Sequence, residues 1–256
     1  MASALFICPC FGQYGYACAA LQSYFKHGGS EYLAIVVDDA SPEAADWEIL
    51  LQRLRQTVGV SADKLLAHRF EVRDGLTRSW NYGLTKAREL GVDYVVCGNS
   101  DILFTPGWDE PLLYGLDHTF RLVGPLSNAP GPTNNGKQDV AHYVPNFRLT
   151  DNEAVLADTA AYLRARYGAT TFVESNINGF CLMSKTAMWW DGAFDAAHVF
   201  DPKHRLTFNE DELQRRWFAR QWKAGIAMGS YVFHYRAVTR GDKHRHHGSF
   251  RRKDNP

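Results

Sequence analysis

The sequence predicts an α/β fold in which a mostly parallel central sheet is flanked by helices within a single domain. Short apolar runs alternate with segments of helical period from residue 5 to residue 97, and this β-α-β-α-β-α-β order is typical of a parallel sheet covered on both faces. Two of the apolar runs end in acidic residues. The 256 residues are 45% hydrophobic, which is enough for the core of one large domain.

The elements of the first half follow from the spacing of apolar residues. Helical spacing predicts helices at 16–26, 41–54 and 76–90. Gly91 follows the last of these, at a position where glycine commonly ends a helix. The apolar runs predict strands at 5–8, 32–37, 64–71 and 92–97.

After Asp101 the pattern is less regular. A turn at 105–108 precedes a short helix that ends near Leu116. The segment 128–146 is rich in Gly, Pro and Asn, and long loops in compact domains are commonly functional or disordered. The remaining elements are predicted strands at 122–125, 178–184 and 226–234, and predicted helices at 152–167 and 211–223.

Charge and cysteine content exclude several classes of protein. Lys plus Arg and Asp plus Glu each number 28, so the chain as a whole has no bias toward polyanions. No window approaches the ~20 apolar residues that span a bilayer, and the N-terminus lacks the basic leader of a signal peptide. The five cysteines form neither a CxxC pair nor a zinc-ligand spacing. Free thiols suit a reducing compartment, so we expect a cytoplasmic protein, in the host cytoplasm if the chain is viral.

The first acidic strand end is the run VVDDAS at 36–41. Ligands of open α/β sheets bind at the carboxyl ends of the strands, where a carboxylate can accept hydrogen bonds from a nucleobase or from ribose hydroxyls. Asp38, Asp39 and Ser41 are therefore candidate nucleotide ligands. A helix N-cap explains the same residues equally well, and both interpretations hold together if Ser41 caps a helix while Asp39 binds the ligand.

The segment 74–83 reads DGLTRSWNYG and opens a helix after a predicted strand. Helix N-termini near a sheet edge favour anions, so Arg78 can meet a diphosphate and Asn81 can hydrogen-bond a base or ribose. Ordinary capping with a solvated Arg78 is the alternative. Neither GxGxxG nor a Walker motif occurs in the chain, so nothing favours a dinucleotide-binding or P-loop protein.

The second acidic strand end is Asn99-Ser100-Asp101. A carboxylate at this edge suits Mg²⁺ or Mn²⁺, which prefer oxygen ligands and share them with phosphates. His234 ends the last predicted strand and can supply a nitrogen ligand. The alternatives are an Asx-turn at 99–101 and a structural histidine at 234.

A further acidic cluster, NEDE at 209–212, opens a predicted helix. Acidic residues are common in the first turn of a helix because they interact favourably with the helix dipole. The functional alternative is a base that deprotonates an acceptor hydroxyl.

Taken in order, these segments resemble the inverting family 2 glycosyltransferases, which have the GT-A fold of the nucleotide-diphospho-sugar transferases. The resemblance runs from about Phe6 to His234 and so covers nearly the whole chain. Its specificity lies in the shared order and spacing of the segments, since no single motif is decisive. They are VVDDAS at 36–41, Gly75 with NYG at 81–83, NSDI at 99–102 with TPGW at 105–108, NGFCLM at 178–183, FD at 194–195 with NEDEL at 209–213, and WKAG at 222–225.

The resemblance implies transfer of a sugar from a nucleotide-diphosphate sugar, with a UDP-sugar expected, to an acceptor hydroxyl such as that of a glycan. Asp101 and His234 would ligate Mn²⁺ or Mg²⁺, and Asp211, helped by Glu210, would activate the acceptor for in-line attack. Asn-Ser-Asp stands where the family has Asp-x-Asp, so weak metal binding is expected. The implied nucleotide ligands are Asp38, Asp39, Ser41, Arg78, Asn81, Asn99 and Ser100.

The same resemblance divides the chain by function. We expect one domain at 1–235, with a nucleotide-binding half at 1–101 and an acceptor half at 102–235. The basic segment 236–256 is expected to be a flexible tail. The expected lid and acceptor residues are Asn128, Gln138, Asn178 and Gly179.

Three other functions stay open. The basic tail favours hydroxymethylated bases of DNA as the acceptor, as in phage-type DNA glycosyltransferases, although terminal charge runs are commonly just solvated. A sugar nucleotidyltransferase also pairs a parallel sheet with a metal, but it normally has a glycine-rich loop with a lysine after the first strand, and 8–13 reads CPCFGQ. The third is a non-catalytic binding module with this fold.

Overall fold

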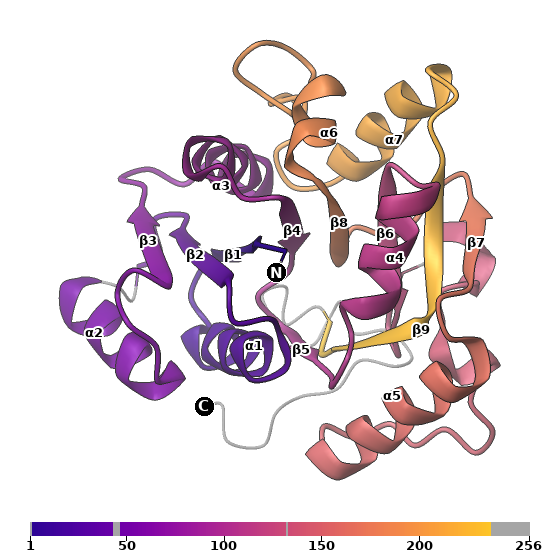
Figure 1. Ribbon diagram of the computed structural model, residues 1–256. Helices are drawn as coiled ribbons and strands as arrows, with labels where there is room; N and C mark the ends of the chain where they lie inside the picture. Colours follow the sequence, from indigo (N-terminus) through magenta and orange to yellow (C-terminus); the bar gives the residue numbers. More distant parts are fainter. Residues whose placement is uncertain (1, 43–46, 132, 237–256) are drawn as a thin grey trace.

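The computed structural model describes residues 2–42, 47–131 and 133–236 (Figure 1). The tail predicted at 236–256 therefore lies outside the described residues except for Arg236. The strands are β1 (Ala4–Cys10), β2 (Tyr32–Asp38), β3 (Leu65–Arg69), β4 (Tyr94–Gly98), β5 (Ile102–Phe104), β6 (Leu122–Leu126), β7 (Thr171–Glu174), β8 (Cys181–Lys185) and β9 (Ala224–His234).

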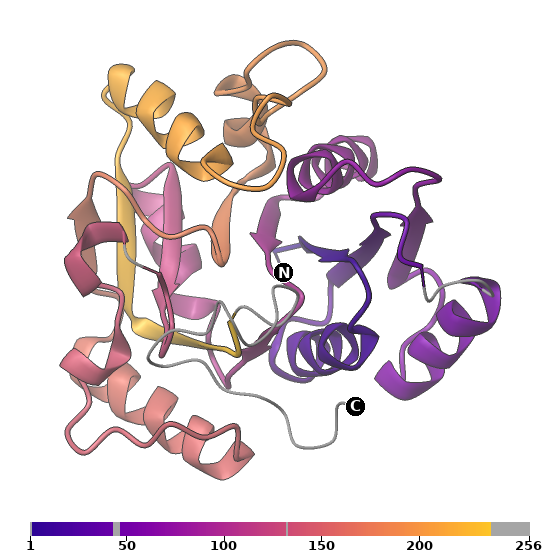
Figure 2. The ribbon, with the colours of Figure 1, turned by 180° about the vertical axis from the view of Figure 1, so that it is seen from behind.

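The helices lie on both sides of the strands, as Figures 1 and 2 show from opposite directions. Within the described part of the chain, no helix is both long enough and apolar enough to cross a bilayer. The helices are α1 (Tyr14–His27), α2 (Trp47–Val58), α3 (Leu76–Leu90), α4 (Glu110–His118), α5 (Glu153–Tyr167), α6 (Thr186–Asp191) and α7 (Asn209–Ala219), with short 3₁₀ turns η1 (Thr133–Gly136) and η2 (Val140–His142).

The described strands form one sheet in the order β3-β2-β1-β4-β8-β6-β9-β5, and β7 also pairs with β9. Strands β1 to β4 are mutually parallel where they pair. The second half is mixed, because β8 is antiparallel to β4 and β6 whereas β6 is parallel to β9. The predicted α/β fold with a mostly parallel central sheet flanked by helices is confirmed.

Alternation along β1 assigns the helices to the two faces. Leu5 and Ile7 belong to the same buried cluster as Trp80 of α3. Phe6, between them, faces the other way and packs on Tyr24 of α1 with ring centroids 5.2 Å apart. Successive side chains of a strand point to opposite faces, so the apolar run of β1 is buried on both sides.

A close contact between α3 and β1 brings the helix down onto the sheet. A Cβ atom on Gly83 would lie 2.6 Å from the side chain of Ile7. Glycine at this position therefore allows the helix to approach the strand, and the N-terminus of α3 comes to the edge where β2 ends.

The last strand, β9, lies between β6 and β5 in the sheet. All of its residues are buried, and it pairs with β6 along its first part and with β5 at its end. The register of its pairing with β6 shifts between Pro125 and Leu126. At its end, His234 lies opposite Ile102 of β5, so the C-terminal end of β9 reaches the residues that follow β4.

Several elements differ from the predictions. Strands β5 and β7 and helix α6 are not predicted, because they are 3, 4 and 6 residues long and too short to show a period. Helix α7 ends at Ala219 rather than at 223, since Gln221 has a φ of 60°, in the left-handed region. Strand β8 begins at Cys181 rather than at 178. The predicted start of the helix at 41–54 falls partly on 43–46, outside the described residues.

The cysteines are free thiols, as predicted. Four of the five are buried, and only Cys18 is partly exposed. Burial raises the pKa of the Cys97 and Cys181 thiols, which makes both poor nucleophiles.

Candidate active site

Both acidic strand ends lie at the same edge of the sheet. Strand β1 pairs in parallel with β2 and with β4, and the register places Cys10 beside Asp38 and Ile7 beside Cys97. The chain therefore leaves β2 and β4 at one carboxyl edge, which is where open α/β sheets bind ligands. Residues from the two signatures can act on one ligand there.

Asp38 is fully buried and is held by protein groups on several sides. The Tyr14 hydroxyl donates to its carboxylate at 2.7 Å and the Ser41 N–H donates at 3.1 Å. Arg69 forms an ion pair with the same carboxylate. Burial raises the pKa of the Tyr14 hydroxyl above its ordinary value, so Tyr14 stays a donor. These contacts hold Asp38 below the edge of the sheet, and its contact with a nucleotide stays a prediction.

Asp39 faces the N-terminus of α3. Its Oδ1 accepts from the Asp74 N–H at 3.0 Å and from the Arg78 guanidinium at 2.6 Å, and its Oδ2 accepts from the Gly75 N–H at 2.7 Å. The guanidinium of Arg78 also stacks over the ring of Phe70, 3.7 Å from its centroid. Arg78 is therefore held beside Asp39, and both remain at the edge where the ligand is expected.

Ser41 and Asn81 connect segments of the fold. The Ser41 hydroxyl oxygen accepts from the Gly12 N–H at 2.7 Å, which ties the turn after β1 to the end of β2. Asn81 is buried; its Oδ1 accepts from the N–H groups of Val199 and Phe200 at 3.0 and 2.9 Å, and its Nδ2 donates to the Phe200 carbonyl at 2.9 Å. These hydrogen bonds hold the loop before α7 against α3. The contact of Asn81 with a nucleotide stays a prediction.

Asp101 and His234 face each other where β9 ends. Nε2 of His234 lies 3.3 Å from Oδ1 of Asp101, and their side chains are 6% and 14% exposed. Nδ2 of Asn99 lies 3.2 Å from the same Nε2. Ser100, between Asn99 and Asp101, is half-buried. The structure thus brings together the second acidic signature and the histidine that we predicted as its nitrogen ligand.

The imidazole of His234 is fixed by its neighbours. Nδ1 lies 2.9 Å from the Ala129 carbonyl oxygen, and a carbonyl only accepts, so Nδ1 carries the proton and donates. Phe180 stacks on the ring, with centroids 5.4 Å apart and planes at 19°. The side chain of Asn128 accepts from the His234 N–H at 2.8 Å and donates to its carbonyl at 2.9 Å. The Asn128 side chain therefore forms the two hydrogen bonds with the backbone of His234 that an adjacent strand would form.

This geometry fits a divalent cation. With the proton on Nδ1, Nε2 is the ring nitrogen that faces the Asp101 carboxylate, 3.3 Å away, and a cation between these two atoms would be held by both. Metal-bound histidines commonly donate their other ring N–H to a carbonyl. Adjacent ligands of an octahedral ion with bonds near 2.1 Å are about 3 Å apart. The pair therefore suits two adjacent positions of Mg²⁺ or Mn²⁺.

The loop that we predicted as a lid is anchored to the sheet. Gln138 is fully buried; its Nε2 donates to the Pro125 carbonyl at 3.0 Å, and its Oε1 accepts from the N–H and the Nδ2 of Asn178 at 2.7 and 3.0 Å. A Cβ on Gly131 would lie 2.5 Å from Oδ1 of Asn178. Gln138, which we expect to be a lid or acceptor residue, is thus engaged by the Pro125 carbonyl and by Asn178. Together with Asn128, these residues fix the loop beside His234.

Glu210 and Asp211 lie against the segment that leads into β8. A Cβ on Gly179 would lie 2.8 Å from Cδ and from Oε1 of Glu210, so glycine lets this carboxylate approach the backbone. Oδ1 of Asp211 accepts from Nδ2 of Asn176 at 2.5 Å. The first turn of α7 therefore lies against the segment 176–179 through Glu210 and Asp211.

Comparison with known families decides between the classes that such a site allows. Residues 6–167, more than half of the chain, match the family described as Glycosyl transferase family 2. This chain belongs to glycosyl transferase family 2. The predicted family is confirmed, while Asp211 and His234 lie beyond the matched residues. No curated protein matches the sequence.

Solved structures show the same fold as this family 2 chain. The structure of GalNAc-T7 with UDP, GalNAc and Mn²⁺ matches 91% of this chain, with a TM-score of 0.65 and 13% sequence identity. The structure of Staphylococcus aureus TarS 1–349 also matches 91% of this chain, with a TM-score of 0.56 and 15% identity. The complex of TarS 1–349 with UDP matches 91% of this chain as well, with a TM-score of 0.54 and 14% identity. The family 2 chain spans 44% of the GalNAc-T7 chain and 60% of each TarS chain.

Some residues near the site of this family 2 chain are not predicted from the sequence. The guanidinium of Arg73 stacks over Phe11, 3.6 Å from the ring centroid, and joins two loops at the edge that carries Asp39. Gln214 is buried on α7 and bonds to the segment before β8. Its signal in the sequence is a polar residue one helical turn after Glu210, on the face that buries apolar residues of the same helix.

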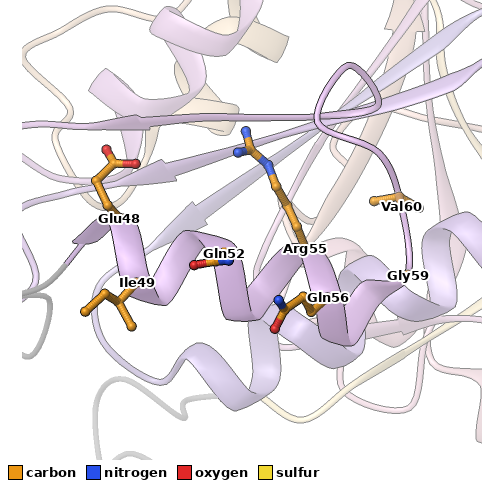
Figure 3. Close-up of a pocket in the computed structure, with 7 residues that line it drawn as sticks. All are labelled: Glu48, Ile49, Gln52, Arg55, Gln56, Gly59 and Val60. Carbon is orange, nitrogen blue, oxygen red and sulfur yellow. The ribbon is translucent and has the colours of Figure 1, made fainter.

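Two cavities of the described part lie away from this edge. One of about 620 Å³ is lined by residues of α2 and by the two residues that follow it (Figure 3). Another of about 450 Å³ lies between α1 and the start of α5. Neither is lined by the residues that we predicted for the site. The first is lined by Glu48, Ile49, Gln52, Arg55, Gln56, Gly59 and Val60.

Proposed function

We propose that this chain transfers a sugar from a nucleoside diphosphate sugar to an acceptor hydroxyl, with inversion at the anomeric carbon. The observation that carries the proposal is the pairing of Asp101 with His234 at the edge where β2 ends in Asp38 and Asp39. Membership of family 2 supports sugar transfer. The fold shared with GalNAc-T7 and TarS, whose structures contain UDP, supports a UDP-sugar as donor. Family membership leaves the nucleotidyltransferase alternative without support.

The nucleoside end of the donor is assigned to the edge around Asp39. Asp39 lies at the N-terminus of α3, where backbone N–H groups and the helix dipole favour its negative charge, and Arg78 pairs with it. Asn99 and Ser100 follow β4 at the same edge. Asp38, buried behind them, holds the edge in place through Arg69.

The diphosphate end is assigned to Asp101 and His234. A bound Mn²⁺ or Mg²⁺ would neutralise charge on the departing diphosphate. Among residues 2–42, 47–131 and 133–236, no cluster of three or more His, Cys, Asp or Glu side chains could hold a metal. Oδ1 of Asp101 and Nε2 of His234 would therefore share the ion with diphosphate and water oxygens, and metal binding is expected to be weak until the nucleotide is present.

Asp211 is the proposed base. Its Oδ1 is engaged by Asn176, and no other hydrogen bond to its carboxylate occurs in the described part of the chain. Oδ2 takes the proton of the acceptor hydroxyl, the acceptor oxygen bonds to the anomeric carbon, and the bond from that carbon to the diphosphate oxygen breaks. A single displacement of this kind inverts the configuration. Glu210 lies beside the base and against Gly179.

The acceptor is assigned to the glycan class, with hydroxymethylated DNA as the alternative that the basic tail favours. A gel-shift with hydroxymethylated and plain DNA at low salt separates the two, because phosphate contacts are strongest there. DNA acceptors require binding that weakens with salt and that depends on residues 237–256. Absence of any shift rejects DNA.

The proposed donor class is tested by thermal unfolding with UDP, GDP, dTDP and CMP, each with and without Mn²⁺. A ligand at a hundred times its dissociation constant stabilises the fold by about 2.7 kcal/mol, and we expect the largest rise in Tm with UDP and Mn²⁺ together. A chain that responds to none of the four nucleotides would contradict the proposed function. The Asp101→Asn variant is the matched control, and it should lose the part of the rise that depends on Mn²⁺.

A further inference from the structure

We propose that Gln214 and Asn176 are positioning residues that aim one oxygen of Asp211 at the acceptor. The inference rests on the proposed role of Asp211 as base. Gln214 lies in α7 and is 2% exposed, and Asn176 lies between β7 and β8 and is half-buried. The two side-chain amides connect the backbone of Ile177, in the segment before β8, to the carboxylate of Asp211.

Hydrogen bonds to the backbone determine which way the Gln214 amide points. Its Oε1 accepts from the Ile177 N–H at 2.7 Å, and a backbone N–H only donates, so this atom is the oxygen. Nε2 then faces the Ile177 carbonyl at 2.8 Å, the Glu210 carbonyl at 3.2 Å and Oδ1 of Asn176 at 2.7 Å. Reversing the amide would set a nitrogen against the N–H and an oxygen against two backbone carbonyls, which excludes the other orientation.

The direction of Gln214 sets the direction of Asn176. Because Nε2 of Gln214 donates, the atom of Asn176 that it meets is Oδ1, and the Nδ2 of Asn176 is left to face Asp211. That nitrogen lies 2.5 Å from Oδ1 of Asp211. The series Ile177–Gln214–Asn176–Asp211 therefore runs in one direction only and ends with a donor on one carboxylate oxygen.

This arrangement selects the oxygen that reacts. A carboxylate oxygen that accepts an amide hydrogen is a poorer site for a new proton than its partner, so the acceptor proton goes to Oδ2. The same hydrogen bond limits rotation of the carboxylate about its side chain. Asp211 is thereby held in one geometry before the acceptor arrives, which is how positioning contributes to rate.

Two variants break the series at different points. Asn176→Ala removes the donor to Asp211 without adding charge. Gln214→Glu keeps the shape of the side chain and replaces Nε2 with an oxygen, so Asn176 must turn its amide and present Oδ1 to Asp211. Asn152→Ala is the matched control, because Asn152 caps α5 by accepting from the Ala154 and Val155 N–H groups and touches neither α7 nor β8.

The test measures UDP release from UDP-glucose, UDP-galactose, UDP-GlcNAc and UDP-GalNAc, with water as the acceptor, together with binding of UDP and Mn²⁺. We expect kcat to fall roughly tenfold to a hundredfold in Asn176→Ala and Gln214→Glu, in the range typical of general base catalysis, while KM and UDP affinity change by less than about twofold. The double variant should be no slower than the slower single variant, because both act through one path. Asn152→Ala should keep the wild-type kcat.

A second measurement does not depend on turnover. The side-chain amide signals of Asn176 in a ¹⁵N NMR spectrum, assigned by their loss in Asn176→Ala, should shift in Asp211→Ala and again in Gln214→Glu. The inference is overturned if the two variants lower kcat independently of each other or if they change KM alone. It is also overturned if the Asn176 signals do not shift in Gln214→Glu. A wild-type chain that neither binds UDP nor releases it would instead reject the proposed function, so the two failures are distinguishable.

Discussion

Nε2 of His234 lies 3.3 Å from Oδ1 of Asp101, because antiparallel pairing of β5 with β9 sets His234 directly opposite Ile102. The segment after β4 and the last residue of β9 are thereby joined by backbone hydrogen bonding as well as by their side chains. Unfolding of the end of β9 would separate the pair. The candidate metal site is therefore formed only when the final strand has completed the sheet.

Asn99→Asp is expected to tighten metal binding. Nδ2 of Asn99 lies 3.2 Å from Nε2 of His234, so an aspartate there would offer a second carboxylate oxygen within reach of the same ion. We expect a roughly tenfold higher apparent affinity for Mn²⁺, since affinity rises with the number of charged ligands. The measurement is free Mn²⁺ followed by electron paramagnetic resonance at saturating UDP. His234→Ala is the opposite control, with an expected loss of at least about tenfold; equal affinities in all three proteins would reject this metal site.

Gly179→Ala is expected to displace Glu210 with little loss of stability. The new Cβ would lie 2.8 Å from Cδ and Oε1 of Glu210, and these are the far end of a flexible side chain, so the cost should stay below about 1 kcal/mol. Donor turnover should fall while UDP binding is kept. The informative control is Gly179→Ala combined with Glu210→Ala, in which the added methyl group meets no carboxylate. If Gly179→Ala still lowers turnover in that background, the contact with Glu210 is not the cause.

Ala40→Gly is expected to stabilise the fold. Ala40 has a φ of 59°, and a left-handed conformation costs an alanine about 1 kcal/mol or more relative to glycine. Part of the gain is lost to the greater freedom of glycine in the unfolded chain, so we expect less than about 1 kcal/mol, or roughly 2–4 °C in Tm. Gly91→Ala is the mirror control, because Gly91 has a φ of 68° and nothing lies within 4 Å of the point that an added Cβ would occupy. Its Tm should fall by a similar amount, and a rise would contradict the argument from backbone strain.

Asp117→Asn is expected to cost stability at neutral pH but not in acid. Lys185, at 2.8 Å, and the Tyr94 hydroxyl, at 2.6 Å, lower the pKa of the Asp117 carboxyl below its ordinary value. A carboxyl whose pKa is lower in the folded state stabilises the fold above its unfolded pKa of about 4, and this contribution is lost as pH falls through the folded value. Because the side chain is 45% exposed, the effect at pH 7 should stay under about 1 kcal/mol. Urea unfolding of both proteins at pH 7 and pH 3 checks this, and an equal difference at both pH values would refute it.

The parts of the fold that could be predicted are those with a long local pattern. Strands β1, β2 and β4 and helix α3 have continuous apolar or periodic residues, and α3 begins and ends where its spacing and Gly91 indicate. Strands β5 and β7 lack such a pattern, because three or four residues cannot show a period. Both form because they pair with β9, which lies far from them in the sequence.

The candidate site divides in a similar way. Residue type and position at a strand end were enough to name Asp38, Asp39, Asp101 and His234 as candidates. They were not enough to separate Asp38 from Asp39, since adjacent carboxylates differ only in what meets them, and Asp38 meets Tyr14 and Arg69. Gln138 likewise sits in a polar loop by sequence and is fully buried in the structure.

The sequence by itself determined the α/β class, the order of the main elements, the family resemblance and the residue types at the carboxyl edge. Those properties depend on neighbours in the chain, through alternation, helical spacing and the residue that ends each strand. Only the tertiary structure decided which polar side chains face the edge and which are buried in hydrogen bonds, because each such bond joins segments far apart in the sequence. The pairing of Asp101 with His234, and the path from Gln214 through Asn176 to Asp211, exist only once the sheet and α7 have packed together.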